Sequence, residues 1–167
     1  MEITLLPMTI DICHSFYKEF VLDLDLFQDP KQYKPYVYEE AACNAYFERH
    51  RNMGRIHLAV MLQDQPIGEI VLKNIDHQQK CCTMGITMVN DIFKNKGYGT
   101  QAEILTLQYA FDNLGMDTVY ADALIRNKRS QHVLEKAGFT ETHRSDGFVY
   151  YQCRKNNSIP HPVDIIT

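Results

Sequence analysis

The stretch that decides the fold is Asp91-Ile92-Phe93-Lys94-Asn95-Lys96-Gly97-Tyr98-Gly99-Thr100. An apolar segment at 84–89 precedes it, and a helical pattern at 101–113 follows it. We therefore expect a strand, a tight glycine-bearing turn and a helix in succession. The glycines let the backbone turn closely and point successive N–H groups toward one place, at the positive end of the helix dipole. With Lys94 and Lys96 added, this turn predicts a site for phosphate oxygens.

Outward from this turn, the chain predicts one domain in which strands and helices are mixed. On the N-terminal side we expect a strand at 2–8, a helix from Thr9 or Asp11 to about Phe20, an irregular segment at 21–37, a helix at 39–50, and strands at 57–62, 66–75 and 81–89. Short turns between those last three strands indicate an antiparallel meander.

On the C-terminal side we expect a strand at 118–124, a helix at 128–136, and a hairpin of two strands at 139–144 and 148–153 around Asp146-Gly147. The helix at 101–113 joins the strands at 84–89 and 118–124 as a crossover. A crossover of this kind favours parallel placement of the two strands it connects.

The totals of the chain narrow its class. Its 167 residues fit a single domain spanning 1–167, with 155–167 as a peripheral tail. A net charge of −4 argues against a nucleic-acid partner and is compatible with a cationic substrate. We see neither a signal-peptide pattern nor a run of the roughly 20 apolar residues that a membrane helix needs, so we expect a cytoplasmic protein with no membrane partner.

The five cysteines and seven histidines have no metal-ligand spacing. Cys81 and Cys82 are adjacent, and neighbouring cysteines rarely bridge each other. We therefore expect reduced thiols and no metal site.

Two motifs carry a resemblance to a known family. The first is Lys94-Asn95-Lys96-Gly97-Tyr98-Gly99-Thr100, and the second is Asn127-Lys128-Arg129-Ser130 followed by Leu134-Glu135-Lys136-Ala137-Gly138-Phe139. In this order and at this separation, the chain resembles the Gcn5-related N-acetyltransferase (GNAT) superfamily, most of all its ribosomal-protein N-terminal acetyltransferases. The resemblance implies an α/β GNAT fold: a mixed, mostly antiparallel sheet of six to seven strands, splayed at the cofactor site, with about four helices on its faces.

The resemblance also implies a cosubstrate, acetyl-CoA, held where the strands at 84–89 and 118–124 splay apart. The implied cofactor-binding residues are Thr87, Met88, Val89, Lys94, Asn95, Lys96, Gly97, Tyr98, Gly99, Thr100, Asn127 and Ser130. In this family the pantetheine arm pairs with main-chain groups, here near Thr87 and Val89. A main-chain N–H near Met88 or Val89 would stabilise the oxyanion that develops during direct transfer to an amine.

The proton-transfer groups are less closely determined. Many relatives place a Tyr acid where this chain has Leu134, whereas the ribosomal-protein branch uses the serine that corresponds to Ser130; a plain surface serine is the alternative. Asn127 would hold the cofactor or the local geometry, and it also suits a helix N-cap. For the general base, Glu69 or Asp122 could orient a water, although Glu69 would also suit an exposed strand position.

For the amine acceptor, relatives build pockets from the region that contains Tyr33 and Tyr36, which could instead cover the edge of the core. Asp122 is a further substrate-binding candidate. The acidic groups Asp23, Asp25 and Asp29 would favour a cationic acceptor. We expect an acetyl-CoA-dependent N-acetyltransferase, monomeric or homodimeric, that acetylates a protein N-terminus or a small amine. Because the Tyr acid and a Glu on the strand before the loop are missing, a non-catalytic acyl-CoA-binding regulatory module is the alternative.

Overall fold

The computed structural model describes residues 2–157, 159 and 160. In chain order its helices and strands are β1 (Thr4–Pro7), α1 (Ile10–Lys18), the 3₁₀ turns η1 (Leu24–Leu26) and η2 (Pro30–Gln32), α2 (Glu40–Asn52), β2 (Ile56–Leu62), β3 (Gln65–Asp76), β4 (Cys81–Met88), η3 (Asp91–Phe93), α3 (Tyr98–Asp112), β5 (Thr118–Leu124), α4 (Lys128–Ala137), β6 (Thr140–Ser145) and β7 (Phe148–Arg154). Within the expected tail, Ile159 packs against the core, while 158 and 161–167 lie outside the described residues.

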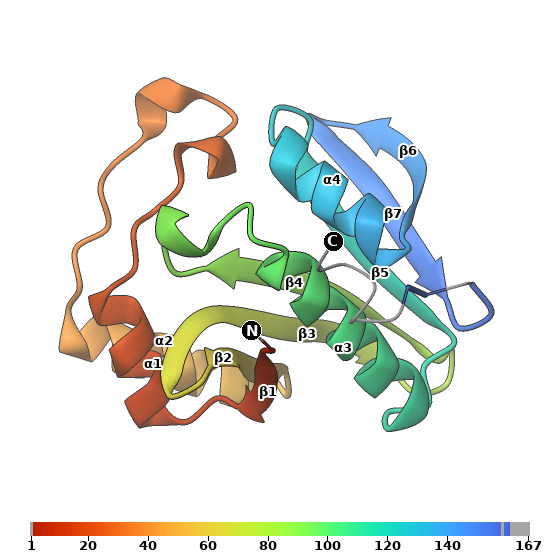
Figure 1. The fold of residues 1–167 in the computed structure, drawn as a ribbon, viewed down its shortest axis with the longest axis horizontal. Coiled ribbons are helices and arrows are strands. Elements are labelled where there is room, and N and C mark those ends of the chain that lie inside the picture. Colours follow the sequence, from red (N-terminus) through yellow and green to blue (C-terminus); the bar gives the residue numbers. More distant parts are fainter. Residues whose placement is uncertain (1, 158, 161–167) are drawn as a thin grey trace.

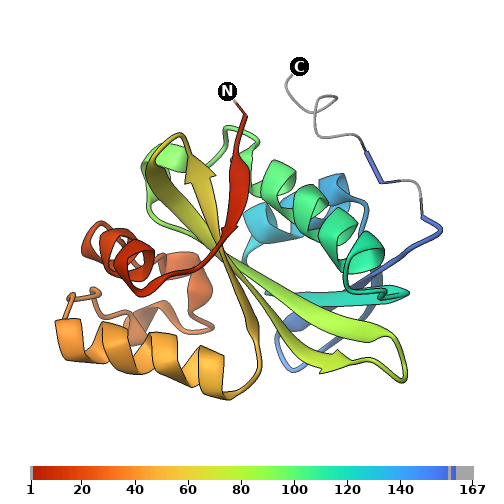
Figure 2. The ribbon, with the colours of Figure 1, turned by 90° about the horizontal axis from the view of Figure 1, so that it is seen from below.

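Seven strands form one sheet in the order β1-β2-β3-β4-β5-β7-β6 (Figure 1). Every neighbouring pair is antiparallel except β4 and β5, which are parallel. Helices α1 and α2 lie on one side of the sheet, and α3 and α4 lie on the other (Figure 2). These observations confirm the predicted mixed, mostly antiparallel sheet with helices on its faces.

Helix α3 begins at Tyr98, three residues before the expected start at 101. The reason is local, because Gly97 takes a left-handed conformation (φ +80°) and serves as the N-cap of the helix. Asn95, two residues earlier, is left-handed as well (φ +59°). The first turn of α3 therefore belongs to the glycine loop itself, which places helix N–H groups inside the predicted phosphate site.

The two parallel strands separate after a short paired region. β4 and β5 pair only at Cys81–Thr118, Cys82–Val119 and Thr83–Tyr120. Beyond Thr83, the remaining residues of β4 pair with β3 alone. A gap therefore opens in the middle of the sheet, between the C-terminal halves of the two strands.

Main-chain groups of β4 point into this gap. The Val89 N–H donates to the Ile67 carbonyl oxygen at 2.9 Å, and in the adjacent register Gly68 faces Met88. Bonded and non-bonded pairs alternate along an antiparallel ladder. Ile86 and Met88 therefore direct their N–H and C=O groups away from β3, toward the gap.

Gly68 keeps β3 close to this part of β4. A Cβ added at Gly68 would lie 3.1 Å from Met88 Sδ, 3.2 Å from the Thr87 carbonyl oxygen and 3.3 Å from Val60 Cβ. We expect Gly68→Ala to destabilise the protein by about 1–3 kcal/mol, because a main-chain oxygen cannot move aside as a side chain can. Chemical denaturation measures this cost.

Gly85 on β4 provides the matched control. A Cβ added at Gly85 meets no heavy atom within 4 Å. Gly85→Ala should therefore change stability by less than about 0.5 kcal/mol, or raise it slightly by restricting the unfolded chain. Equal losses in the two variants would show that close approach at Gly68 does not limit the packing of β3 on β4.

Candidate active site

A cavity of about 540 Å³ lies beside the gap. Its walls come from the end of β4, the glycine loop, the first turns of α3 and α4, and the segment that follows α1. Of the predicted cofactor-binding residues, ten line it: Thr87, Met88, Lys94, Asn95, Lys96, Gly97, Gly99, Thr100, Asn127 and Ser130. The two motifs that are separate in the sequence thus meet at one cavity.

The glycine loop presents a row of free N–H groups to this cavity. The Lys94 N–H donates to the Asp91 carbonyl and the Gln101 N–H donates to the Gly97 carbonyl. Between them, no hydrogen bond within the described residues engages the N–H groups from 95 to 100. A helix N-terminus with such donors binds phosphate oxygens.

The two glycines of the loop have different roles. Gly97 is needed for its left-handed backbone. Gly99 lies inside α3, where an added Cβ would make only an ordinary contact, 3.6 Å from Val133 Cγ1. Since Gly99 also lines the cavity, its small size leaves room for a ligand close to the helix backbone.

One carboxylate ties three segments together at the edge of the cavity. Asp23, in the segment after α1, accepts a hydrogen bond from Lys94 Nζ at 2.6 Å and is also bonded by the Arg129 guanidinium. Burial alone would raise the pKa of Asp23, but the Lys94 hydrogen bond and positive charge outweigh it and hold the pKa below its ordinary value. The Val21 N–H also donates to the Val89 carbonyl oxygen at 2.8 Å, so the segment is fastened to the end of β4.

This pairing changes the interpretation of the acidic segment. The Asp23 carboxylate forms ion pairs with Lys94 and Arg129, and Asp25 Oδ1 lies 3.7 Å from Arg126 Nη2. Asp29 accepts the Lys31 main-chain N–H at 3.0 Å. Asp23 and Asp25 are thus paired with cations of the protein itself, whereas Asp29 is exposed and accepts only a main-chain N–H.

A second cavity, of about 210 Å³, runs through the gap. Its walls include Met84 and Ile86 of β4, Ala121 and Ala123 of β5, and Glu103 of α3. On the opposite face of the sheet the cavity reaches Asp122 and Phe148. Along β5 the buried residues face α3 and α4, whereas Asp122 is exposed on the face that α1 and α2 share. The gap therefore connects the two faces of the sheet.

Asn127 and Ser130 lie where the two cavities meet, because both residues line both of them. Asn127 is buried, and its Oδ1 accepts the Ser130 N–H at 3.0 Å, so it is the N-cap of α4. Both roles considered for Asn127, helix cap and cavity wall, thus coexist in one side chain. The cap also fixes where the Ser130 hydroxyl lies.

Glu69, the other candidate base, is buried beneath α1 and α2. Its Oε1 accepts hydrogen bonds from the hydroxyls of Tyr17 at 2.6 Å and Tyr46 at 2.9 Å, and its Oε2 lies 2.7 Å from His57 Nε2. Glu69 is not an exposed strand residue, and it lines neither cavity. Its carboxylate joins α1, α2 and β2 through these three contacts.

Besides Glu69, four predicted site residues lie away from the cavity walls. Val89 is buried, and both its N–H and its carbonyl are already bonded, so it cannot offer the main-chain contacts expected of it. The Tyr98 side chain packs against the core, although its N–H belongs to the free row. Tyr36 packs on Tyr17 and Phe20, and Tyr33 packs edge-on against Phe27, so both tyrosines contribute to packing.

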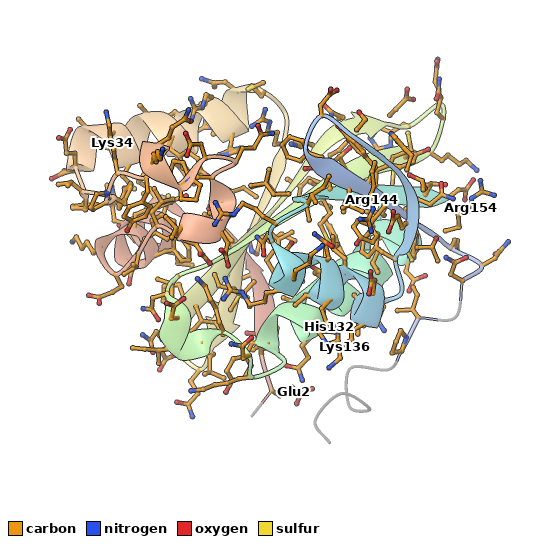
Figure 3. All side chains as sticks on the ribbon, turned by 90° about the horizontal axis from the view of Figure 1, so that it is seen from above. Glu2, Lys34, His132, Lys136, Arg144 and Arg154 are labelled. Carbon is orange, nitrogen blue, oxygen red and sulfur yellow. The ribbon has the colours of Figure 1, made fainter. Side chains whose placement is uncertain are left out.

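The structure adds residues that the motifs did not single out. Arg129, His132 and Lys136 of α4 line the larger cavity, and Arg129 and Lys136 are cationic (Figure 3 labels His132 and Lys136). Because these residues are three and four positions apart, they lie on one face of the helix, and this spacing can be recognised in the sequence. No comparable pattern marks Glu103 in the sequence, because residues on most faces of α3 are buried and no single face stands out.

A sheet that opens between two parallel strands, beside a glycine-capped helix N-terminus, suits a phosphate group at the helix and an extended chain in the gap. The chain belongs to the family described as the acetyltransferase (GNAT) domain, whose model matches residues 3–140. It is thus an acyltransferase that uses acetyl-CoA, an N-acetyltransferase. A search among curated proteins finds no match.

Several solved structures share the fold. An aminoglycoside acetyltransferase in complex with coenzyme A has a TM-score of 0.74 at 16% identity, over 92% of this chain and 95% of that one. The N-acetyltransferase PseH of Campylobacter jejuni has a TM-score of 0.68 at 18% identity, over 92% and 99%. A dodecameric spermidine N-acetyltransferase of Vibrio cholerae has a TM-score of 0.69 at 16% identity, over 92% and 94%.

Two features of the described residues suit the binding of acetyl-CoA. These are the unpaired N–H donors, which suit the pyrophosphate, and the open edge of β4, which suits the pantetheine arm. Within the same residues, no three His, Cys, Asp or Glu side chains are grouped as metal ligands. None of the helices described has the length and apolar character to cross a membrane.

Proposed function

We propose that the protein transfers the acetyl group of acetyl-CoA directly to a primary amine, with both substrates bound at once and on opposite sides of the gap. The observation that carries the proposal is the opening between β4 and β5, which joins the glycine-loop cavity to the face bearing Asp122. Holding the amine and the thioester next to each other supplies much of the acceleration through proximity.

The cofactor side of the site consists of the glycine loop and the free edge of β4. The N–H groups of 95–100 would bind the pyrophosphate, and the inward-pointing main-chain groups of Ile86 and Met88 would pair with the pantetheine arm. Acetyl-CoA supplies the activated acetyl group as a thioester. Among the main-chain groups considered for the oxyanion, the Met88 N–H is the one directed into the gap, so we assign it that role.

Proton transfers complete the reaction. Asp122 takes a proton from the ammonium, directly or through a water, which frees the nitrogen lone pair. The amine nitrogen bonds to the acetyl carbon while the carbon–sulfur bond breaks, and the Ser130 hydroxyl, at the junction of the two cavities, delivers a proton to the leaving sulfur. Because a thiolate is a good leaving group, a weak acid such as the Ser130 hydroxyl is sufficient. The acylated nitrogen then loses its second proton, which returns through water to the Ser130 oxygen and leaves a neutral amide.

The acceptor side is the open face of β5, β7 and β6. Tyr150 lies opposite Asp122 in the strand register. Its ring stacks on the His143 ring, with the two ring centroids 4.5 Å apart. A carboxylate beside an aromatic pair favours a cationic amine. Neighbours in the fold include enzymes named for spermidine and for aminoglycosides, which are cationic amines. We therefore place a small cationic amine ahead of a protein N-terminus.

A thiol-release assay across an amine panel tests the proposal. The panel contains spermidine, an aminoglycoside and short peptides with free N-termini, each at saturating acetyl-CoA. We expect turnover with the small cationic amines and little with the peptides. The reverse preference would contradict the acceptor class. Calorimetric binding of acetyl-CoA without turnover of any amine would contradict the transfer itself.

A further inference from the structure

One buried carboxyl group of α3 has no hydrogen-bond partner among the described residues. Glu103, in the second turn of α3, has no exposed surface. Neither of its carboxyl oxygens has a hydrogen-bond partner among the described residues. Native proteins satisfy nearly all their buried polar atoms, so a carboxyl left unpaired by its own chain calls for an explanation.

The position of Glu103 supplies that explanation. It contributes to the walls of both the larger cavity and the gap cavity. Its neighbours along the gap are mostly apolar, from Met84 and Ile86 on β4 to Ala121 and Leu134 on β5 and α4. The polar residues of this mostly apolar channel are Glu103, Asp122, Asn127 and Ser130. This matches the usual construction of a ligand site, in which a few polar groups fix the orientation of the ligand.

The charge state follows from the surroundings. The nearby cations Lys94 and Arg129 are both bonded to Asp23, and no described cation forms an ion pair with Glu103. Burial without a counter-charge raises the pKa of Glu103 well above its ordinary value. Burial of this kind favours the neutral acid over the carboxylate, and a neutral acid can donate one hydrogen bond and accept another.

We propose that Glu103 is a cofactor-binding residue whose carboxylic acid hydrogen-bonds an amide of the pantetheine arm as that arm lies in the gap. The arm carries amide groups that need partners once they leave water, and the Glu103 carboxyl needs a partner within the same channel. This inference rests on the proposed function for the placement of the arm. It adds a side-chain contact to the main-chain contacts of β4.

The test compares Glu103→Met and Glu103→Gln with a matched control, Gln101→Met. Gln101 is also a buried residue of α3 with an unpaired Oε1, but it lines neither cavity. Two ligands are titrated calorimetrically: acetyl-CoA, and adenosine 3′,5′-bisphosphate, which lacks the pantetheine arm. Thermal denaturation of each ligand-free protein is measured in parallel.

We expect Glu103→Met to weaken acetyl-CoA binding about tenfold and to leave the bisphosphate unchanged. The same variant should melt about 2–4 °C higher without ligand, because it removes an unpaired buried carboxyl. Glu103→Gln keeps a neutral donor and acceptor and should bind acetyl-CoA within about threefold of the wild type. Gln101→Met should bind both ligands like the wild type.

Unchanged acetyl-CoA affinity in Glu103→Met, or equal weakening of both ligands, would overturn the inference. A lower melting temperature of that variant would also overturn it, since the carboxyl would then stabilise the ligand-free fold. The proposed function fails separately: wild-type protein that binds acetyl-CoA but acetylates no amine contradicts the transfer and leaves the role of Glu103 standing.

Discussion

Replacing Asp122 with asparagine should lower kcat about 100-fold or more while leaving acetyl-CoA affinity unchanged. The physical reason is that a positioned general base typically contributes a factor of about 10²–10⁴, and an amide cannot take the proton. Asp122 is exposed at the mouth of the gap cavity, so the substitution should change folding stability by less than about 0.5 kcal/mol. Steady-state kinetics at saturating acetyl-CoA, with calorimetry and denaturation beside it, measures all three quantities.

Glu69→Gln is the matched control for this prediction. Glu69 accepts hydrogen bonds from Tyr17 and Tyr46. In the glutamine variant, the side-chain NH2 group could face one of these tyrosine hydroxyls or His57, so that two hydrogen-bond donors would meet. The substitution should therefore cost about 1–3 kcal/mol of stability, with a smaller effect on kcat. If Asp122→Asn kept normal turnover while Glu69→Gln lost it at unchanged stability, the base would be Glu69.

The second large effect is expected at the glycine loop. Gly97→Ala should weaken acetyl-CoA binding by about 10–100-fold, because each hydrogen bond to a charged phosphate contributes about 1.5–3 kcal/mol and the loop N–H groups would shift. An alanine at φ +80° also costs about 1–2 kcal/mol of backbone strain. Calorimetric titration with acetyl-CoA measures the first quantity, and chemical denaturation measures the second.

Gly115→Ala separates these two effects. Gly115 has a similar left-handed conformation (φ +70°), and an added Cβ would meet nothing within 4 Å. It lies outside both cavities, so it should lose comparable stability and keep its affinity for acetyl-CoA. Comparable loss of affinity in both variants would mean that general destabilisation, and not the loop geometry, weakens binding.

Much of the fold could be predicted because its signals are local. The strand, glycine turn and helix around 84–113, the short turns of the meander and the Asp146-Gly147 hairpin all depend on neighbouring residues. The crossover rule then gave the parallel pair β4 and β5, which the structure confirms. The start of α3 was missed by three residues, because it depends on the left-handed backbone at Gly97.

The site was harder to predict, since its side chains meet from distant parts of the chain. Asp23 and Lys94 are 71 residues apart, and Asp23 and Arg129 are 106 apart. No local spacing reveals that these charges pair, so the acidic segment suggested a free cation-binding surface. The burial and partners of Glu69 could not be predicted for the same reason, because these partners come from α1, α2 and β2.

The gap has a consequence for how the protein holds together. Among the residues that the structure describes, three residue pairs join the strands β1–β4 to the strands β5–β7 across the sheet, and α3 packs on α4. A cosubstrate bound as we propose, along the free edge of β4 and against α4, would join these two blocks. Mass action then links occupancy to folding, adding about 2.7 kcal/mol at a ligand concentration of 100 Kd. Supply of acetyl-CoA would thereby set both the rate of this enzyme and its lifetime as a folded protein.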